Sequence, residues 1–300
     1  GLHDSALKAW QRRCGVTTPA RRKRKLIVMR TPPFPLLLCV GLLLAPLVVR
    51  AQPAAASPLA ELSVASLQLP AQEDPGWEHR REAIAQLLAT LRPDVITVQS
   101  VLQEGRRNPA CWLASRLRYS CDFITSDPPS QAQRHGSAML SRLRVEEDGV
   151  TLLHPPGRFS AAGMMRVAVG EGQVNIYVAR LRPEPDTAAN RQHQTNDLMA
   201  WIAATSDGHP SLVAGDFSAS SSEVVRGMPG FQPARRNPSA RAEKSGAANG
   251  SVDSHGLDVL FQVKSFSGKR QQRIELPAEG EMPLLPLGVM AVLRLQAPAG

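Results

Sequence analysis

The sequence lacks the short motifs that mark several common enzyme classes. It contains no G-x-S-x-G nucleophile elbow, no Walker phosphate-binding loop, no C-x-x-C pair and no glycine-rich dinucleotide fingerprint. Serine hydrolases of the elbow type, P-loop nucleotidases, thioredoxin-like enzymes and dinucleotide-dependent enzymes are therefore not indicated. Any chemistry has to come from dispersed polar residues that the fold brings together.

The sequence also lacks an uninterrupted apolar run long enough to cross a membrane. Its most apolar stretch, residues 34–49, is broken by Pro35 and Pro46, whereas a spanning helix needs about 20 apolar residues. The basic start after Met29, the apolar run and the small residue at Ala51 are typical of a secretory signal peptide. The alternative is a retained membrane anchor.

This pattern predicts an exported protein, periplasmic or extracellular, with no membrane span after processing. The signal peptide covers residues 29–51, and we expect residues 1–28 to be an upstream extension that is not part of the fold. Residues 52–60 form a lead-in, and the folded domain extends over 61–296.

Acidic residues are scarce in only one part of the chain. Residues 1–51 hold ten Lys or Arg side chains and a single acid, Asp4, and so account for the whole net charge of +9. The rest of the chain carries 25 basic and 25 acidic side chains. A neutral chain leaves no global electrostatic footprint for nucleic acid in the mature protein.

Cysteine is rare, and only Cys111 and Cys121 remain after the signal peptide. No second Cys or His pair lies near them, so a metal site is not indicated. Because the export signal predicts an oxidising compartment, we expect a disulfide between them. The alternative is two buried free thiols that pack as small hydrophobic side chains.

Apolar periodicity predicts an α/β domain with ten strands and three or four helices. A strand over 61–68, an amphipathic helix over 78–92 and a buried strand over 94–99 form the first unit. Further strands are expected at 119–124, 137–140, 150–153, 166–169, 174–181, 211–214, 257–263 and 287–295, and further helices at 111–117 and 187–204, the latter capped by Asp186. The polar stretch 235–255 predicts a flexible surface loop.

The segment SLVAGDFSA, residues 211–219, is the first candidate for a functional site. An apolar run delivers Asp216 to the carboxyl end of a buried strand, where open α/β sheets place their sites, and Gly215 lets the backbone turn or approach a ligand closely. The alternative is that Asp216 only caps the following turn or helix.

The order of the segments resembles the endonuclease/exonuclease/phosphatase superfamily. The similarity is carried over about residues 61–296 by LSVASLQL, RREAIAQLLATLRPDVITVQSV, HGSAMLSR, VNIYVARL with the following RQHQ, LVAGDFSA, LDVLF and LGVMAVLRL. The resemblance implies a deoxyribonuclease-I-like fold, an α/β four-layer sandwich of two packed mixed β-sheets flanked by helices. It also implies Mg²⁺-dependent hydrolysis of phosphodiesters or phosphomonoesters wherever the family's site is complete.

The family site keeps its two aspartates and one side-chain amide, and its second asparagine is lost. Asp216 and Asp258 match the family's aspartates, and Gln68 takes the place of the asparagine that ends the first strand. Ser218 takes the place of the second asparagine. The resemblance therefore implies that Gln68 and Ser218 contact substrate or phosphate, and that the two aspartates are remnants of the catalytic site.

Four other positions depart from the family. Ser100 stands where the metal-binding glutamate is expected, and a hydroxyl cannot supply the anionic oxygen that Mg²⁺ prefers. Arg180 replaces a histidine with a permanent cation, and Leu285 and Pro286 replace the closing aspartate–histidine pair. Loss of the general base alone costs about 10²–10⁴ in rate, and loss of the metal removes further charge stabilisation.

We interpret the chain as an exported pseudoenzyme that has lost metal-dependent phosphoester hydrolysis, needs no cofactor and acts by binding. The alternative is a divergent Mg²⁺-dependent phosphodiesterase, phosphatase or nuclease. In that case Asp216 would share the metal with a substitute acid such as Glu104 or Asp253.

A third hypothesis assigns Arg180 to a phosphate-containing ligand, with help from Arg142 or Arg182. The alternative for each arginine is a solvated surface charge. The partner itself is not predicted by the sequence.

Overall fold

The computed structural model describes residues 60–71, 75–183, 185–217, 221–234, 256–280 and 283–296. The expected upstream extension, the signal peptide, residues 52–59 of the lead-in and the polar stretch 235–255 lie outside the described residues. Everything described falls within one compact unit, residues 56–300.

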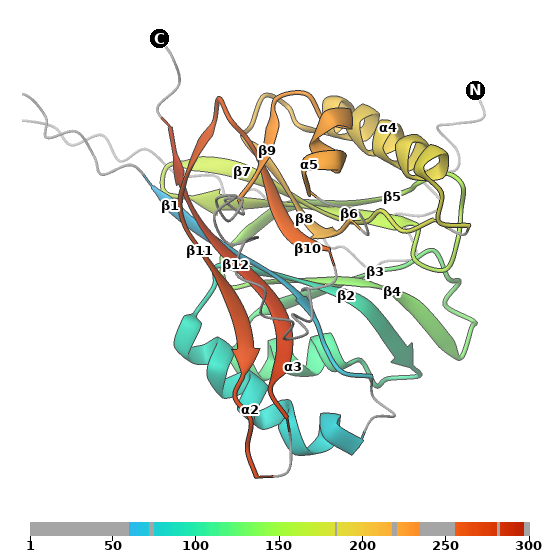
Figure 1. Ribbon diagram of the computed structural model, residues 1–300, viewed down its shortest axis with the longest axis vertical. Helices are drawn as coiled ribbons and strands as arrows, with labels where there is room; N and C mark the ends of the chain where they lie inside the picture. Colours follow the sequence, from blue (N-terminus) through green and yellow to red (C-terminus); the bar gives the residue numbers. More distant parts are fainter. Residues whose placement is uncertain are drawn as a thin grey trace, which may run out of the picture. The chain divides into compact units, whose positions relative to one another are not determined.

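Twelve strands form two six-stranded sheets (Figure 1). Sheet A has the order β11-β12-β1-β2-β4-β3, and sheet B has the order β5-β6-β7-β8-β10-β9. The strands of sheet A are β1 (Glu61–Gln68), β2 (Val95–Glu104), β3 (Ser120–Ile124), β4 (Gln133–Ser141), β11 (Phe266–Leu276) and β12 (Leu285–Leu295). Those of sheet B are β5 (Val145–Leu152), β6 (Ala161–Val169), β7 (Gly172–Arg180), β8 (Ser211–Asp216), β9 (Phe231–Pro233) and β10 (Leu257–Gln262).

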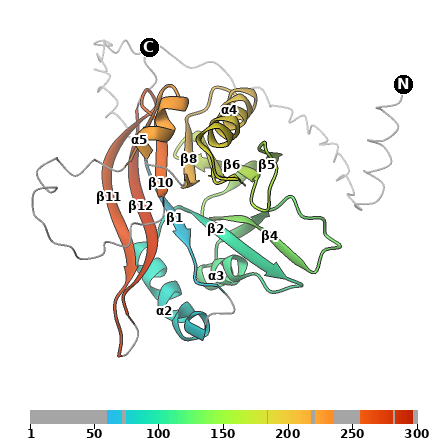
Figure 2. The ribbon, with the colours of Figure 1, turned by 45° about the vertical axis from the view of Figure 1, so that its right-hand side comes forward.

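Helices cover the outer face of each sheet, which completes a four-layer arrangement. Figures 1 and 2 both show α2 (Pro75–Leu91) and α3 (Pro109–Leu117) beside sheet A. The other side carries α4 (Ala188–Thr205), the short α5 (Ser221–Val224) and a single 3₁₀ turn, Val225–Gly227. None of the helices in the described part of the chain is both long and apolar enough to span a membrane.

Three clusters of buried side chains fill the spaces between these layers. The central cluster joins the inner faces of the two sheets through residues such as Val64, Ile176 and Leu212. A second cluster seats α2 and α3 on sheet A, and a third seats α4 on sheet B. The expected α/β sandwich of two packed mixed sheets is therefore confirmed.

Most of the expected elements are confirmed, and the differences have physical causes. Apolar periodicity did not predict β11, because its exposed segment from Ser267 to Arg270 has no apolar side chain. Such polarity suits a strand at the edge of a sheet, where β11 lies. The short β9 was also missed.

Two local expectations can be compared directly with the structure. The cap of α4 is Thr187, whose hydroxyl accepts from the Asn190 amide at 3.2 Å, so the prediction that Asp186 caps this helix was wrong. Asp186 instead forms an ion pair with Arg191 at 2.6 Å. The expected disulfide is present, and its two Cα atoms are 5.4 Å apart.

Candidate functional site

The ends of four strands meet at one end of the sandwich. In sheet A, β1 runs parallel to β2 with Gln68 opposite Gln99, and in sheet B, β7 runs parallel to β8 with Arg180 opposite Asp216. Parallel neighbours present their carboxyl ends at the same edge, which is where α/β sheets place sites. The Ser66 hydroxyl donates to the Gly215 carbonyl at 3.3 Å, so β1 and β8 approach each other across the two sheets.

Asp216 is the buried acid of this region, and two arginines contact it. Only 2% of its surface is exposed. Arg182 Nε lies 3.2 Å from Oδ2, and Arg182 Nη2 donates to Oδ1 at 3.3 Å. Arg180 Nε lies 3.6 Å from Oδ2. The carboxylate is therefore balanced by side-chain cations that come from the end of the neighbouring strand.

The sequence Arg180-Leu181-Arg182 explains how both cations reach the same carboxylate. Alternate residues of an extended segment point to the same side, and the Leu181 amide donates to the Asp216 carbonyl at 2.8 Å, which holds this segment beside β8. The Arg180 guanidinium also lies 4.3 Å from the ring centre of Phe159, within the range of a cation–π contact. Phe159 in turn meets the ring of His135 edge to face, at 5.6 Å.

An apolar cavity of about 190 Å³ occupies the place where the two sheets meet. It is lined by Gln68, Leu69, Pro70, Leu257, Leu285, Pro286, Leu287 and Gly288. Leu257 lies opposite Asp216 in the β8–β10 register, so the residue that faces the acid across this pair is apolar. The two positions that replace the family's aspartate–histidine pair thus belong to an apolar wall.

Two glycines allow the backbones around this cavity to come close. A Cβ at Gly215 would lie 1.9 Å from the Ala179 carbonyl oxygen, and a Cβ at Gly288 would lie 2.0 Å from the Ser66 carbonyl oxygen. Neither neighbour is a flexible side chain. At Gly215 the close approach is to strand β7, and the expectation that this glycine lets the backbone approach a ligand stays a prediction.

Gln99 and Ser100 lie at an irregular point of β2. The pairing with β4 shifts between Val98 and Val101, and Ser100 has a left-handed backbone with φ of 56°. The buried Gln99 amide accepts from the Ser137 hydroxyl at 3.2 Å, while its Nε2 has no hydrogen-bond partner among the described residues. Both residues line a second cavity of about 180 Å³, together with His135.

The structure does not bring all of the predicted residues together. Asp258 is buried, but it lies opposite Gly215 and its Oδ1 accepts from the Val259 amide at 2.8 Å. Glu104 accepts from the Gln133 side chain at 2.6 Å, and its place in β2 is about 13 Å along the strand from Ser100.

Three further residues of the sequence hypotheses lie elsewhere or beyond the described residues. Arg142 pairs with Asp94 at the start of β2, so the prediction that it helps Arg180 was wrong, and Arg182 is the one that shares a partner with Arg180. Ser218 and Asp253 lie outside the described residues.

The residues present at this site do not fit a divalent metal. The family's metal-binding glutamate is replaced by Ser100. Of the two acids that remain, Asp216 is already contacted by two arginines, and Asp258 accepts from the Val259 amide. Across the part of the chain that the structure describes, no group of three His, Cys, Asp or Glu side chains could hold a metal ion.

Sequence reasoning missed two contributors to the site. Phe159 lies in the connection between β5 and β6, where no periodic pattern marks it. Gln99 has a stronger signal, because an amide within the apolar run 95–101 is a buried polar group that needs partners.

Comparisons with known proteins agree with this fold. The model of the Endonuclease/Exonuclease/phosphatase family matches residues 69–240, whereas no curated protein sequence matches the chain. The solved human Nocturnin catalytic domain is 18% identical, with a TM-score of 0.61 over 79% of this chain and 94% of that one.

Two further solved structures are similar to the same extent. A humanized TDP2 of D. rerio is 12% identical, with a TM-score of 0.60 over 78% of this chain and 99% of that one. An endonuclease/exonuclease/phosphatase from Beutenbergia cavernae is 17% identical, with a TM-score of 0.59 over 79% and 72% of the two chains. At these identities the structures establish the fold, and the family model covers more than half of the chain. The chain therefore belongs to the endonuclease/exonuclease/phosphatase family.

Proposed function

We propose that this protein is an exported, non-hydrolytic member of its family that acts by binding. The observation that carries the proposal is the contact of Arg180 and Arg182 with Asp216. In a metal-dependent phosphoesterase, the acid at this position needs a free carboxylate and further anionic ligands. Here two permanent cations occupy its surroundings, and a divalent cation would have to displace them against charge repulsion.

The apolar wall of the 190 Å³ cavity supports the same proposal. Leu285 and Pro286 offer neither an anionic oxygen nor a proton acceptor, and Leu257 faces Asp216. A hydrolytic site needs a group that activates water. The residues that replace the family's proton-transfer pair cannot do so.

We propose a phosphate-containing molecule as the ligand of this region. Arg182 keeps 37% of its side chain exposed while it contacts Asp216, although its Nε is buried. Guanidinium groups bind phosphate through paired N–H donors. Gln99 adds a buried amide whose Nε2 has no partner among the described residues.

Metal titration and hydrolysis assays test the loss of activity. We expect no Mg²⁺- or Mn²⁺-dependent cleavage of bis-p-nitrophenyl phosphate or p-nitrophenyl phosphate above background, and no saturable heat of binding for either metal. Metal-dependent turnover that disappears in Asp216→Ala would overturn the proposal. It would favour the divergent hydrolase, with Glu104→Gln and Asp253→Asn as the next variants.

Repair variants test whether one substitution alone explains the loss. We expect Ser100→Glu and Pro286→His to stay inactive singly, because one restores a metal ligand and the other a proton acceptor, and each leaves the second function absent. The combined variant Ser100→Glu, Arg180→His, Ser218→Asn, Leu285→Asp, Pro286→His supplies both. Measurable Mg²⁺ affinity in the combined variant but not in the single ones is the expected pattern.

Arg182→Gln tests the proposed ligand. We expect this variant to weaken the binding of inorganic phosphate, measured by calorimetry at low salt, whereas Arg226→Gln, an exposed arginine on the 3₁₀ turn, serves as the matched control. Equal binding by the two variants would exclude Arg182 as a ligand residue.

Export is proposed from the sequence pattern of residues 29–51. We expect protein from its native source to begin near Gln52, and amino-terminal sequencing measures this. Recovery of residues 1–28 on the mature protein would show that the proposed processing is wrong.

A further inference from the structure

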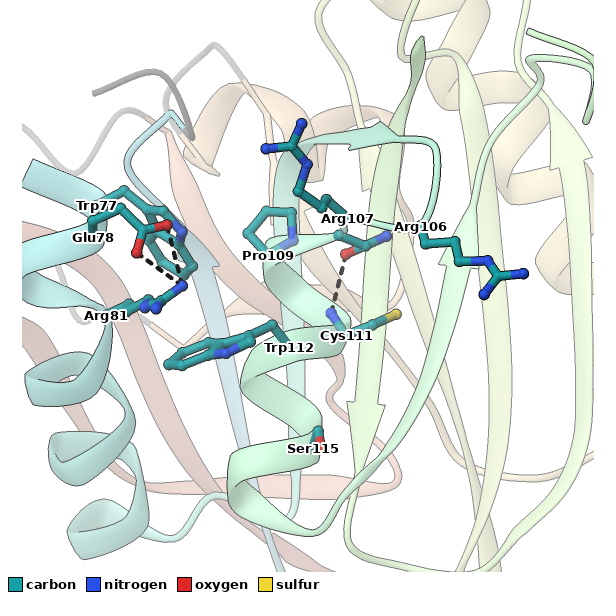
Figure 3. A pocket seen from close by; sticks show the side chains of 10 residues that line it. Trp77, Glu78, Arg81, Arg106, Arg107, Pro109, Cys111, Trp112 and Ser115 are labelled. Carbon is teal, nitrogen blue, oxygen red and sulfur yellow. Dashed lines mark hydrogen bonds and ion pairs between the residues drawn. The ribbon is translucent and has the colours of Figure 1, made fainter. Parts of the chain in front are cut away.

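A separate cavity of about 430 Å³ opens between α2 and α3 on the outer side of sheet A (Figure 3). Its volume falls in the range of about 300–1,000 Å³ that is usual for small-molecule sites. Its lining includes Trp77, Glu78, Arg81, Arg106, Arg107 and Trp112. We call it the α2–α3 cavity.

Two tryptophans give the α2–α3 cavity a rigid aromatic wall. The buried Trp77 meets Trp112 edge to face, with ring centres 5.7 Å apart. The Arg81 guanidinium lies 5.0 Å from the Trp112 ring centre and is held there by Glu78 at 2.9 Å. Trp112 is only partly buried, so a planar surface remains accessible within the cavity.

The charge of the lining is positive. Glu78 is the one acid that lines the cavity, and its carboxylate is paired with Arg81. Arg106 and Arg107 leave the turn before α3 in different directions, and neither forms an ion pair with any residue that the structure describes. The two exposed guanidinium groups therefore favour an anionic ligand.

The frame around the cavity is held in place before any ligand arrives. The Cys111–Cys121 disulfide ties the first turn of α3 to β3, and the Asn108 side chain accepts from the Cys111 amide at 3.0 Å. A preorganised site loses less conformational entropy on binding.

We propose that the α2–α3 cavity binds a small planar organic anion. The ring of the ligand lies against Trp112, Arg107 holds its carboxylate or phosphate, and Arg106, which points in another direction, adds positive charge to the surroundings. This site uses none of the residues around Asp216, so it does not depend on the function proposed above. Aryl carboxylates and nucleoside monophosphates share this chemistry.

Tryptophan fluorescence and calorimetry with matched probes test the proposal on the purified protein. The anionic probes are 2-naphthoate and AMP, the neutral probes are 2-naphthalenemethanol and adenosine, and inorganic phosphate carries charge without a ring. We expect saturable binding of at least one anionic probe, about tenfold or more tighter than its neutral counterpart and than phosphate. Binding of 2-naphthoate alone identifies a carboxylate ligand, and binding of AMP alone identifies a nucleotide.

Substitutions in the lining of the α2–α3 cavity test whether the anionic probes bind there. Trp112→Leu removes the planar wall and should weaken binding about tenfold. The exposed pair Arg106→Gln/Arg107→Gln keeps the fold and should weaken binding by about three- to tenfold, with a smaller salt dependence. Arg116→Gln is the matched control, because Arg116 lies on the same helix outside the cavity, and it should bind as the unaltered protein does.

Three results would overturn the proposal. They are the absence of saturable binding for both anionic probes, equal affinity for the charged and neutral members of a pair, and binding that the Arg106→Gln/Arg107→Gln variant leaves unchanged.

Discussion

Arg182 contacts Asp216 with two nitrogens, Nε at 3.2 Å from Oδ2 and Nη2 at 3.3 Å from Oδ1. Asp216 ends β8, and Arg182 follows the neighbouring parallel strand β7, whose last residue, Arg180, reaches the same carboxylate. Loss of this carboxylate would leave buried positive charge uncompensated and destabilise the folded state. In a cluster of acids without its metal ion, loss of one carboxylate would instead relieve repulsion and stabilise the folded state.

The Asp216→Asn variant tests whether loss of this carboxylate destabilises or stabilises the folded state. We expect the free energy of unfolding to fall by about 2–4 kcal/mol, because the variant leaves Arg180 largely buried without its counter-charge. Urea denaturation without added metal measures the change, and Arg226→Gln should stay within about 0.5 kcal/mol of the unaltered protein. An increase in stability would mean that the carboxylate is under repulsion in the folded state.

Gly215→Ala tests the close approach of β8 to β7. The new methyl group would lie 1.9 Å from the Ala179 carbonyl oxygen, so the backbone of one strand has to shift. We expect a loss of about 3 kcal/mol or more in unfolding free energy. Gly157→Ala is the matched control, since nothing lies within 4 Å of its Cβ position, and unchanged stability in both variants would contradict the packing described here.

The disulfide between Cys111 and Cys121 closes a short loop, with a sequence separation of 10. The chain-entropy relation gives about 2–3 kcal/mol for a loop of this size. We expect the double variant Cys111→Ala/Cys121→Ala to lose about that much stability in urea denaturation. A reducing agent should lower the stability of the unaltered protein and leave the double variant unchanged. Two alkylated thiols in a non-reducing peptide map would exclude the bond.

Asp122 makes the stability of the folded protein depend on pH, and the direction of its pKa shift gives the sign of this dependence. Burial, followed by the charge of Asp148, raises the pKa of Asp122 above its ordinary 3.8, and its Oδ2 has no hydrogen-bond partner among the described residues. The folded state therefore holds this proton more tightly than the unfolded state does, and stability is lost as the pH rises through the folded pKa.

The Asp122→Asn variant should not show the loss of stability that ionisation of Asp122 causes as the pH rises. We expect the variant and the unaltered protein to be equally stable at pH values below the unfolded pKa of Asp122. Above the folded pKa the variant should be the more stable of the two, with a constant difference up to neutral pH. Urea midpoints measured from pH 3 to pH 7 provide the comparison. A difference that does not change over this range would contradict the assigned cause.

The fold was predictable because its central strands appear in the sequence as distinct apolar runs. The run at 94–99 became β2, which is buried from Val95 to Gln99 between β1 and β4. Strand β11 was not predictable in the same way, since an edge strand can be polar and still be paired on one side. Apolar periodicity indicates which residues are buried, and an edge strand can have few buried residues.

The sequence predicted which residues belong to the candidate site, but it did not predict which of them contact each other. The end of an apolar strand identified Asp216, and the resemblance to the family identified Arg180, which ends the neighbouring strand. The ion pairs between them depend on the strand register, which a single sequence does not specify. Phe159 lies in a loop, and its contact with Arg180 is seen only in the three-dimensional structure.

The pairing of β1 with β12 has a consequence for how the protein folds. Glu61 and Arg294 are opposite each other in the register, and their side chains bond over a sequence separation of 233. As the chain folds, β1 can pair with β2 early, while its other edge stays open until residues beyond 285 reach it. Closing so long a loop is slow relative to local pairing. Over that interval the open edge of β1 can pair with another chain, so the yield of folded protein should fall as the concentration of unfolded chains rises.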